Sequence, residues 1–164
     1  MFLKKRNIGL YSSVNEKDSC GIGLVANIYD IPSNGIIENA LKLLSNLTHR
    51  GAVSADPKAG DGVGLLTQIP HQFFQKELSK SNIILPRPDD YAVGMFFLPR
   101  NDEERLHCIE IIKKYFKKFG LEIIVQRKVP TDQSVLGDSI KGKEPSIFQF
   151  FVSETDKSQS INQF

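Results

Sequence analysis

The chain has 164 residues and a formal net charge of +2 at pH 7, with 40% hydrophobic and 24% charged residues. This length suits one domain with a real hydrophobic core, and the composition is that of an ordinary globular protein. The small net charge excludes a general affinity for nucleic acid or for an anionic membrane surface, and no apolar run is long enough to span a bilayer.

The N-terminal third predicts a polar leader, a strand and a helix. Residues 1–19 lack hydrophobic periodicity and resemble a leader or propeptide, because no apolar core of a signal peptide follows their basic start. The apolar run Gly21–Tyr29 predicts a strand buried on both faces. After a turn, helical spacing begins at Ile36 and ends near His49–Arg50, where Gly51 is expected to close the helix in a left-handed conformation.

The middle of the chain predicts two strands with a helix between them. A short strand is expected over Val63–Ile69 and a second over Tyr91–Leu98. Pro70 opens the intervening helix, since proline is well suited to the first turn. Three side chains of this helix are expected to face inward: Phe73, Phe74 and Leu78.

The C-terminal half predicts a long helix and two further strands. The helix Asp102–Phe119 has an apolar face, and Gly120 ends it. Strands are expected over Leu121–Val129 and Ile147–Val152, separated by a polar loop, and the polar residues 153–164 are expected to form a disordered tail. The apolar face of the helix comprises Leu106, Ile109, Ile112, Phe116 and Phe119.

Four blocks occur in a fixed order along the chain. They read C-G-I-G-L-V-A from Cys20, H-R-G-A-V-S-A-D from His49, G-D-G-V-G from Gly60 and Q-R-K-V-P-T-D-Q-S-V-L-G from Gln126. Together they resemble the N-terminal part of the glutamate synthase large subunit, which is a class II glutamine amidotransferase domain. The resemblance implies an α/β (α+β) fold of the N-terminal-nucleophile hydrolase type, an incomplete αββα sandwich of mainly antiparallel sheets, with residues 20–152 as a partial amidotransferase type 2 domain.

Cys20 is the candidate nucleophile. A free α-amine has a pKa of about 7.7–8.0 and a thiol of about 8.5, so a cysteine at a chain terminus carries its own general base. This chemistry requires cleavage between Ser19 and Cys20. The resemblance implies that the thiolate attacks the side-chain amide of glutamine, releasing ammonia and leaving a γ-glutamyl thioester for water to hydrolyse. A structural interpretation stays open, because a lone cysteine commonly packs as a small hydrophobic residue.

Arg50 and Gly51 are candidate residues of the substrate pocket. The resemblance implies that Arg50 lies near the nucleophile, and a guanidinium offers five donors in a fixed geometry. The same two residues also suit an ordinary helix end, which needs no catalysis. The glycine-rich turn Ala59–Gly64 leaves nucleotide binding as a further possibility, although it lacks the G-K-[ST] of a phosphate-binding loop.

No metal and no cofactor are predicted for this chain. Two cysteines form no disulfide framework and suit a reducing compartment, which places the protein in the cytoplasm. They are also too few to hold an iron–sulfur centre. Glutamine is the expected small-molecule partner, with neither nucleic acid nor membrane. No zinc-binding pattern matches the spacing of the candidate metal ligands, which are Cys20, His49, His71, His107 and Cys108.

In the family, the oxyanion donors and the clamp on glutamine come from segments further along a longer domain, and this sequence does not contain them. We therefore expect little or no glutaminase activity from the isolated chain unless a separate chain carries the rest of the domain. The alternative is a catalytically inactive remnant or half-domain that acts at most as an interaction protein.

Overall fold

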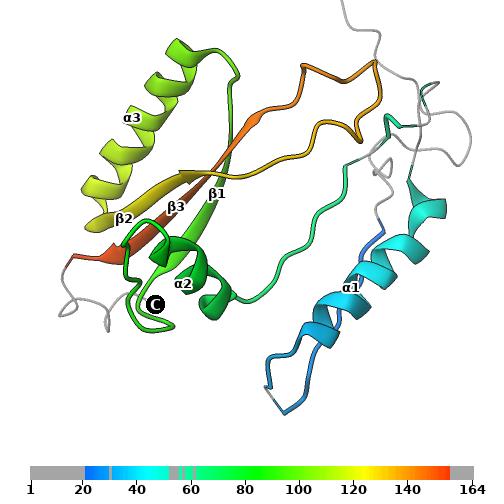
Figure 1. Cartoon of the computed structure of the whole chain (residues 1–164), viewed down its shortest axis with the longest axis horizontal. Helices are drawn as coiled ribbons and strands as arrows, with labels where there is room; N and C mark the ends of the chain where they lie inside the picture. Colours follow the sequence, from blue (N-terminus) through cyan, green and yellow to red (C-terminus); the bar gives the residue numbers. More distant parts are fainter. Residues whose placement is uncertain (1–20, 30, 52–55, 57, 61, 156–164) are drawn as a thin grey trace, which may run out of the picture. The chain divides into compact units, whose positions relative to one another are not determined.

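The computed structural model describes residues 21–29, 31–51, 56, 58–60 and 62–155. The chain divides into two compact units, Met1–Leu65 and Leu66–Phe164, and each is described by itself (Figure 1). Within the described residues, no helix is both long and apolar enough to cross a membrane.

The first unit is built on one helix, α1 (Asn34–Asn46), followed by the short 3₁₀ helix η2 (Thr48–Arg50). The presence of α1 confirms the predicted helix, although α1 begins two residues before Ile36 and ends before His49. The earlier start agrees with the bond from Asn34 Nδ2 to Glu38 Oε1, 2.7 Å long. None of the residues of α1 is buried.

The predicted left-handed conformation of Gly51 is wrong. Its φ of −87° and ψ of 147° are extended, a conformation open to any residue. The reason lies in η2, where the tighter turn already ends the helix and the Gly51 N–H donates to the carbonyl of Thr48 at 3.2 Å.

The two predicted strands Gly21–Tyr29 and Val63–Ile69 are also wrong, because the described residues of both segments have no strand geometry. Ile22, Leu24 and Leu66 are 93%, 87% and 98% exposed. A strand needs a neighbour to bond its backbone groups, and the described part of the chain pairs neither segment with one.

The second unit is a three-stranded antiparallel sheet with strand order β1–β3–β2. Its elements are α2 (His71–Ser79), β1 (Ala92–Leu98), α3 (Asp102–Lys118), β2 (Leu121–Lys128) and β3 (Ser146–Glu154). Both outer strands run antiparallel to β3 and therefore parallel to each other, and α3 connects them. This is a split βαβ arrangement. The mixture of helices and antiparallel sheet confirms the predicted fold class.

The three strands agree with the sequence prediction to within two residues at each end. The end of β3 differs most, because this strand continues through Glu154 and so includes the first two residues of the predicted disordered tail. Residues 156–164 of that tail lie outside the described residues.

β3 lies at the centre of both hydrophobic layers. Phe150 and Phe151 are both 0% exposed and, as neighbours in a strand, point to opposite faces of the sheet. Phe150 packs with Ile109 of α3 on one face. Phe151 packs with Phe74 of α2 on the other, with ring centroids 4.9 Å apart and an interplanar angle of 87°.

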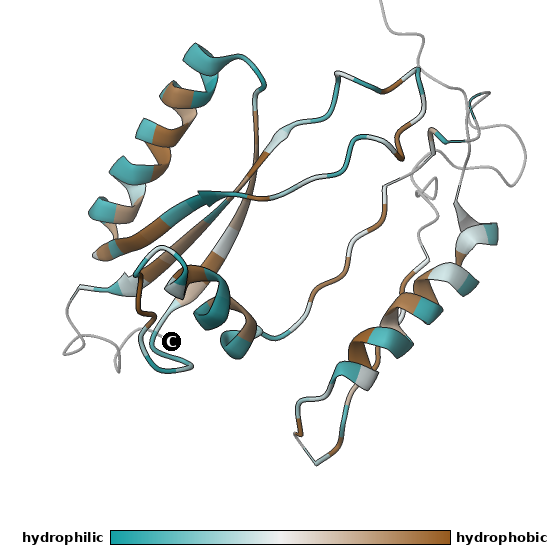
Figure 2. Ribbon diagram, viewed as in Figure 1, coloured by the Kyte–Doolittle hydropathy of each residue, from teal (hydrophilic) through white to brown (hydrophobic). Residues whose placement is uncertain are grey.

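The helices bury fewer apolar side chains than their spacing predicts. Phe73 is 53% exposed, because its neighbour Phe74 takes the inward direction and successive residues of a helix differ by about 100°. Phe119 is 70% exposed, since it follows the last residue of α3 and stacks on Tyr115 instead. Leu106 is 61% exposed, and nothing in the structure explains it. Figure 2 shows hydrophobic and hydrophilic residues alternating along α3.

Both ends of α3 follow from local sequence. The side chain of Asn101 accepts hydrogen bonds from the backbone N–H groups of Glu103 and Glu104, as an N-cap does. Acidic residues occupy the first turn and lysines the last, which suits the helix dipole. Gly120 has a φ of +69°, confirming the predicted glycine end.

We expect Phe150→Ala to lower the free energy of unfolding of the second unit by about 3–5 kcal/mol, because it empties a fully buried site. Leu106→Ala is the matched control on the exposed surface of α3, with an expected loss of roughly 0.5 kcal/mol or less. Urea unfolding followed by circular dichroism measures both. Equal losses in the two variants would contradict the central role of β3.

Candidate functional site

The predicted nucleophile, Cys20, lies outside the described residues, as do Asp61 and the segment 1–19. The structure describes the backbone of Arg50, which lies in η2, but not its side chain. The neighbourhood of the candidate site is therefore built from the residues that follow Cys20 and from the end of α1.

The segment after Cys20 runs beside α1 in the first unit (Figure 1). A β-carbon added at Gly23 would lie 2.3 Å from Leu43 Cδ2, which real side chains do not tolerate. The second glycine of C-G-I-G therefore permits the close approach of this segment to the helix. Asn27 then closes the turn that follows, accepting from the Tyr29 N–H at 2.8 Å and donating to the Ile31 carbonyl at 3.2 Å.

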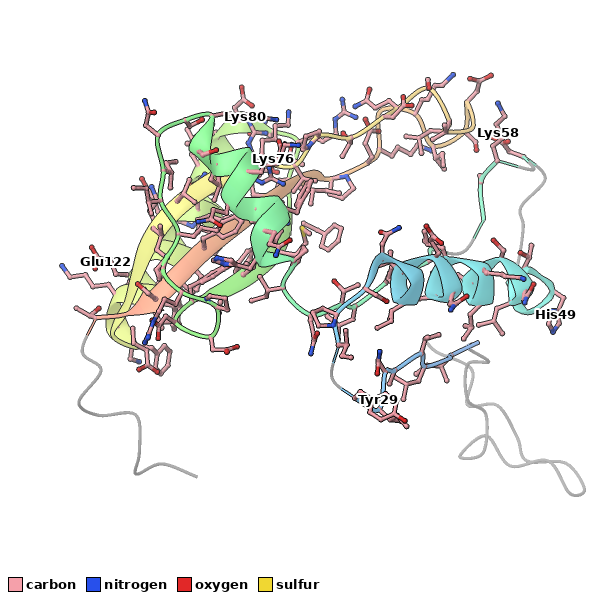
Figure 3. All side chains as sticks on the ribbon, turned by 60° about the horizontal axis from the view of Figure 1, so that its bottom comes forward. Tyr29, His49, Lys58, Lys76, Lys80 and Glu122 are labelled. Atoms are coloured by element: carbon pink, nitrogen blue, oxygen red, sulfur yellow. The ribbon has the colours of Figure 1, made fainter. Side chains whose placement is uncertain are left out.

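The H-R-G block forms the end of the helix. Thr48 Oγ1 donates to the Ser45 carbonyl at 2.5 Å, and His49 Nδ1 lies 2.9 Å from the Asn46 carbonyl oxygen. Figure 3 shows His49 at this end of α1 and Tyr29 near its beginning. These contacts agree with the structural interpretation of the block as a helix terminus, and they hold the backbone of Arg50 in one turn.

The fourth block, from Gln126, continues from β2 into a loop and lines a cavity of about 200 Å³ in the second unit. The residues of this block predict no cavity by themselves. The other lining residues come from the end of β1, the start of α3 and the start of β3, so no local spacing could reveal them. The charged lining residues are Arg100, Asp102, Arg105, Lys128 and Glu144.

Ion pairs within the cavity wall neutralise most of its charge. Arg100 Nη1 lies 2.8 Å from Glu144 Oε1, and Arg105 pairs with Asp102. Arg105 also donates to the backbone carbonyl of Arg100 at 2.7 Å, which ties the start of α3 to the end of β1. The side chain of Lys128 has no hydrogen-bond or ion-pair partner among the described residues. The cavity is therefore a polar cluster that joins three strand ends.

The pKa of the Glu144 carboxyl is lowered from its usual range. Its own backbone N–H is the main cause, and the charge of Arg100 adds to it, against an opposing effect of burial. Both carboxylate oxygens are shielded from solvent. Glu144 is thus a shielded carboxylate held in its charged form by its own backbone N–H and by Arg100.

Among the described residues, no group of three or more His, Cys, Asp and Glu side chains could hold a metal ion. His71 Nδ1 lies 3.1 Å from Tyr91 Oη, and Cys108 packs as a free thiol against the cluster around Ile109.

Comparison with known proteins assigns the chain to a family. Residues 20–164 match the class-II glutamine amidotransferases. The chain is 41% identical over 141 residues, 85% of its length, to the glutamate synthase [NADH] of Schizosaccharomyces pombe. It is 38% identical over 144 residues, 88% of its length, to the glutamate synthase [NADPH] large chain of Bacillus subtilis.

The chain therefore belongs to the class-II glutamine amidotransferases. Its amidotransferase domain is of the glutamate synthase type, which confirms the resemblance drawn from the four blocks. The matched region is 7% of the length of the Schizosaccharomyces pombe protein and 9% of that of the Bacillus subtilis protein.

Glu144→Gln should destabilise the second unit at pH 7 and have little effect in acid. A carboxyl whose pKa is lowered by folding contributes stability above its unfolded-state pKa, near 4.3, and loses it as the pH falls through the lower folded-state value. Urea unfolding of both proteins at pH 7 and at about pH 3 measures the difference. Glu110→Gln, on the exposed surface of α3, is the control; a Glu144→Gln effect that is equal at both pH values would contradict this role.

Proposed function

We propose that this chain hydrolyses glutamine to glutamate and ammonia, with Cys20 as the nucleophile. The observation that carries the proposal is the start of the family match at residue 20, which makes Cys20 the first residue of the matched region. In an N-terminal-nucleophile mechanism, that is where the reactive side chain belongs. The printed names of the relatives, glutamate synthases, agree with glutamate as the product.

The chemistry follows from the position of Cys20 once residues 1–19 are removed. The α-amine takes the proton of the thiol, and the thiolate attacks the side-chain amide carbon of glutamine to form a tetrahedral oxyanion. The protonated amine returns the proton to the leaving nitrogen, which departs as ammonia. Water, activated by the same amine, then hydrolyses the γ-glutamyl thioester and restores the thiol.

Arg50 and Gly51 are proposed as residues of the glutamine pocket. Support comes from the end of α1, where η2 holds this part of the backbone in a single hydrogen-bonded turn. A guanidinium on such a turn could pin a carboxylate or backbone carbonyls with little loss of conformational freedom.

We further propose that a separate chain carries the rest of the amidotransferase domain. The apolar side chains after Cys20 support this, because Ile22 and Leu24 are almost fully exposed in the described unit. Apolar segments of this kind are normally covered in a functioning protein. A partner strand along Gly21–Tyr29 would cover them and hold Cys20 at a defined place, and the partner would supply oxyanion donors.

A second candidate function is that of an interaction protein without catalysis. The same exposed segment favours it, since a nucleophile at the start of an unpaired stretch has no rigid support of the kind that efficient catalysis needs. In that case residues 1–19 remain attached and the α-nitrogen of Cys20 stays in a peptide bond.

Ammonia release from glutamine separates the two functions. We expect the chain as synthesised to release no more ammonia than its Cys20→Ala variant, because Cys20 then lacks its base. A chain beginning at Cys20 should exceed the corresponding Cys20→Ala chain when a partner completes the domain, and by little or nothing without that partner. Cys108→Ala, which removes the other cysteine, is the matched control and should leave the release unchanged.

Intact mass of the same samples shows whether residues 1–19 have been removed. If the chain that begins at Cys20 is as inactive as its Cys20→Ala counterpart, with and without a partner, glutamine hydrolysis is refuted and the interaction function stands.

A further inference from the structure

The sheet of the second unit has two edges of different character. β2 is protected at its edge, because it carries Glu122, Arg127 and Lys128 and has a register irregularity between Ile123 and Val125. Charges and bulges of this kind prevent further strands from pairing. β1 reads A-V-G-M-F-F-L and contains no charge, no proline and no bulge against β3. Within the second unit, as far as the structure describes it, no strand pairs with the outer edge of β1.

The helices cover one face of β1 and leave the other partly exposed. On the covered face, Phe96 packs against Phe116 of α3, with ring centroids 6.1 Å apart, and Leu98 is buried in the cluster of Ile109. α3 packs chiefly against β2. On the other face, Phe74 of α2 contacts Phe151, and the guanidinium of Arg127 from β2 lies 5.6 Å from the same ring. Met95 and Phe97, which share a face of β1, are 49% and 67% exposed.

The sequence of β1 is complementary to itself. In an antiparallel pair centred on Met95, small residues of one strand lie opposite large residues of the other. The ring of Phe96 already lies over Gly94 within one chain, where an added β-carbon would come within 2.7 Å of it. Gly94 therefore leaves room for the Phe96 ring of its own chain. The resulting pairs are Ala92 with Leu98, Val93 with Phe97, Gly94 with Phe96, and Met95 with itself.

Charge selects this register over its neighbours. Centring the pair on Met95 brings Asp90 of one copy toward Arg100 of the other, two residues beyond each end of β1. Centring it on Phe96 would place Asp90 opposite Asp102, and like charges directly opposite are destabilising. Centring it on Gly94 would place the charge of Asp90 opposite Leu98. Within its own chain, Asp90 pairs with Arg87, and Arg100 pairs with Glu144. Each can also interact with the opposite charge of the second copy.

We propose that a second copy of this chain pairs along β1, antiparallel and in register about Met95, so that the two sheets become one continuous sheet. The contact is isologous, with the twofold axis at Met95, and it therefore closes at two copies. A pairing of this size falls below the roughly 1,200 Å² that marks stable complexes, so the dimer is weak and forms at high protein concentration.

Disulfide trapping tests the register in the full chain. In a background with Cys20→Ala and Cys108→Ala, Met95→Cys places two thiols directly opposite each other, about 4.5–5.5 Å apart at their β-carbons, close to what a disulfide requires. Ala92→Cys is the matched control on the same strand, because its two copies would lie about 20 Å apart. We expect oxidised glutathione to give a covalent dimer with Met95→Cys and none with Ala92→Cys.

Sedimentation equilibrium of the unmodified chain provides a second measurement that needs no cysteine. We expect a concentration-dependent dimer whose dissociation constant rises at least tenfold in Phe97→Lys, since a lysine on this exposed position opposes edge pairing. Equal trapping at both cysteine positions would indicate unspecific aggregation and overturn the proposal. A chain that stays monomeric at millimolar concentration would also overturn the proposal. This is the result expected if another segment covers the edge of β1.

Discussion

The second unit depends on the opposite orientation of two adjacent phenylalanines, Phe150 and Phe151, on its central strand. Strand geometry alone sends one to each face, so a single strand supplies the centre of both hydrophobic layers. α2 and α3 then have a fully buried ring to pack against. The order β1–β3–β2 follows, because the strand that is buried on both faces belongs between two neighbours.

Polar interactions organise the end of the same sheet. The pair of Arg100 with Glu144 and the bonds of Arg105 join the start of α3 to the loop that leads into β3. One of the four family blocks contributes the rest of this wall through Lys128, Thr131 and Gln133. A block that resembles an amidotransferase thus has a structural role in the described part of the chain, in addition to its value for recognising the family.

In the first unit, the helix α1 forms, whereas the expected strand before it does not. α1 forms from its own backbone hydrogen bonds, and Gly23 allows the preceding segment to lie against it. The stretch Gly21–Tyr29 has the composition of a buried strand but no partner among the described residues, and its apolar side chains remain exposed. The proposed nucleophile directly precedes this stretch, so catalysis at Cys20 and pairing of the stretch are linked in the proposed function.

The sequence by itself determined the family, through four short blocks in order, and the elements whose signals are local. It predicted β1, β2, β3 and the ends of α3, because alternation, capping and a glycine with positive φ act over a few residues. Only the tertiary structure decided which apolar segments found partners, and so Gly21–Tyr29 and Val63–Ile69 were wrongly predicted to be strands. The polar cavity also forms only in the tertiary structure, because the residues that line it come from separate parts of the chain. Burial and strand pairing are properties of contacts between distant segments, and periodicity within one segment does not contain them.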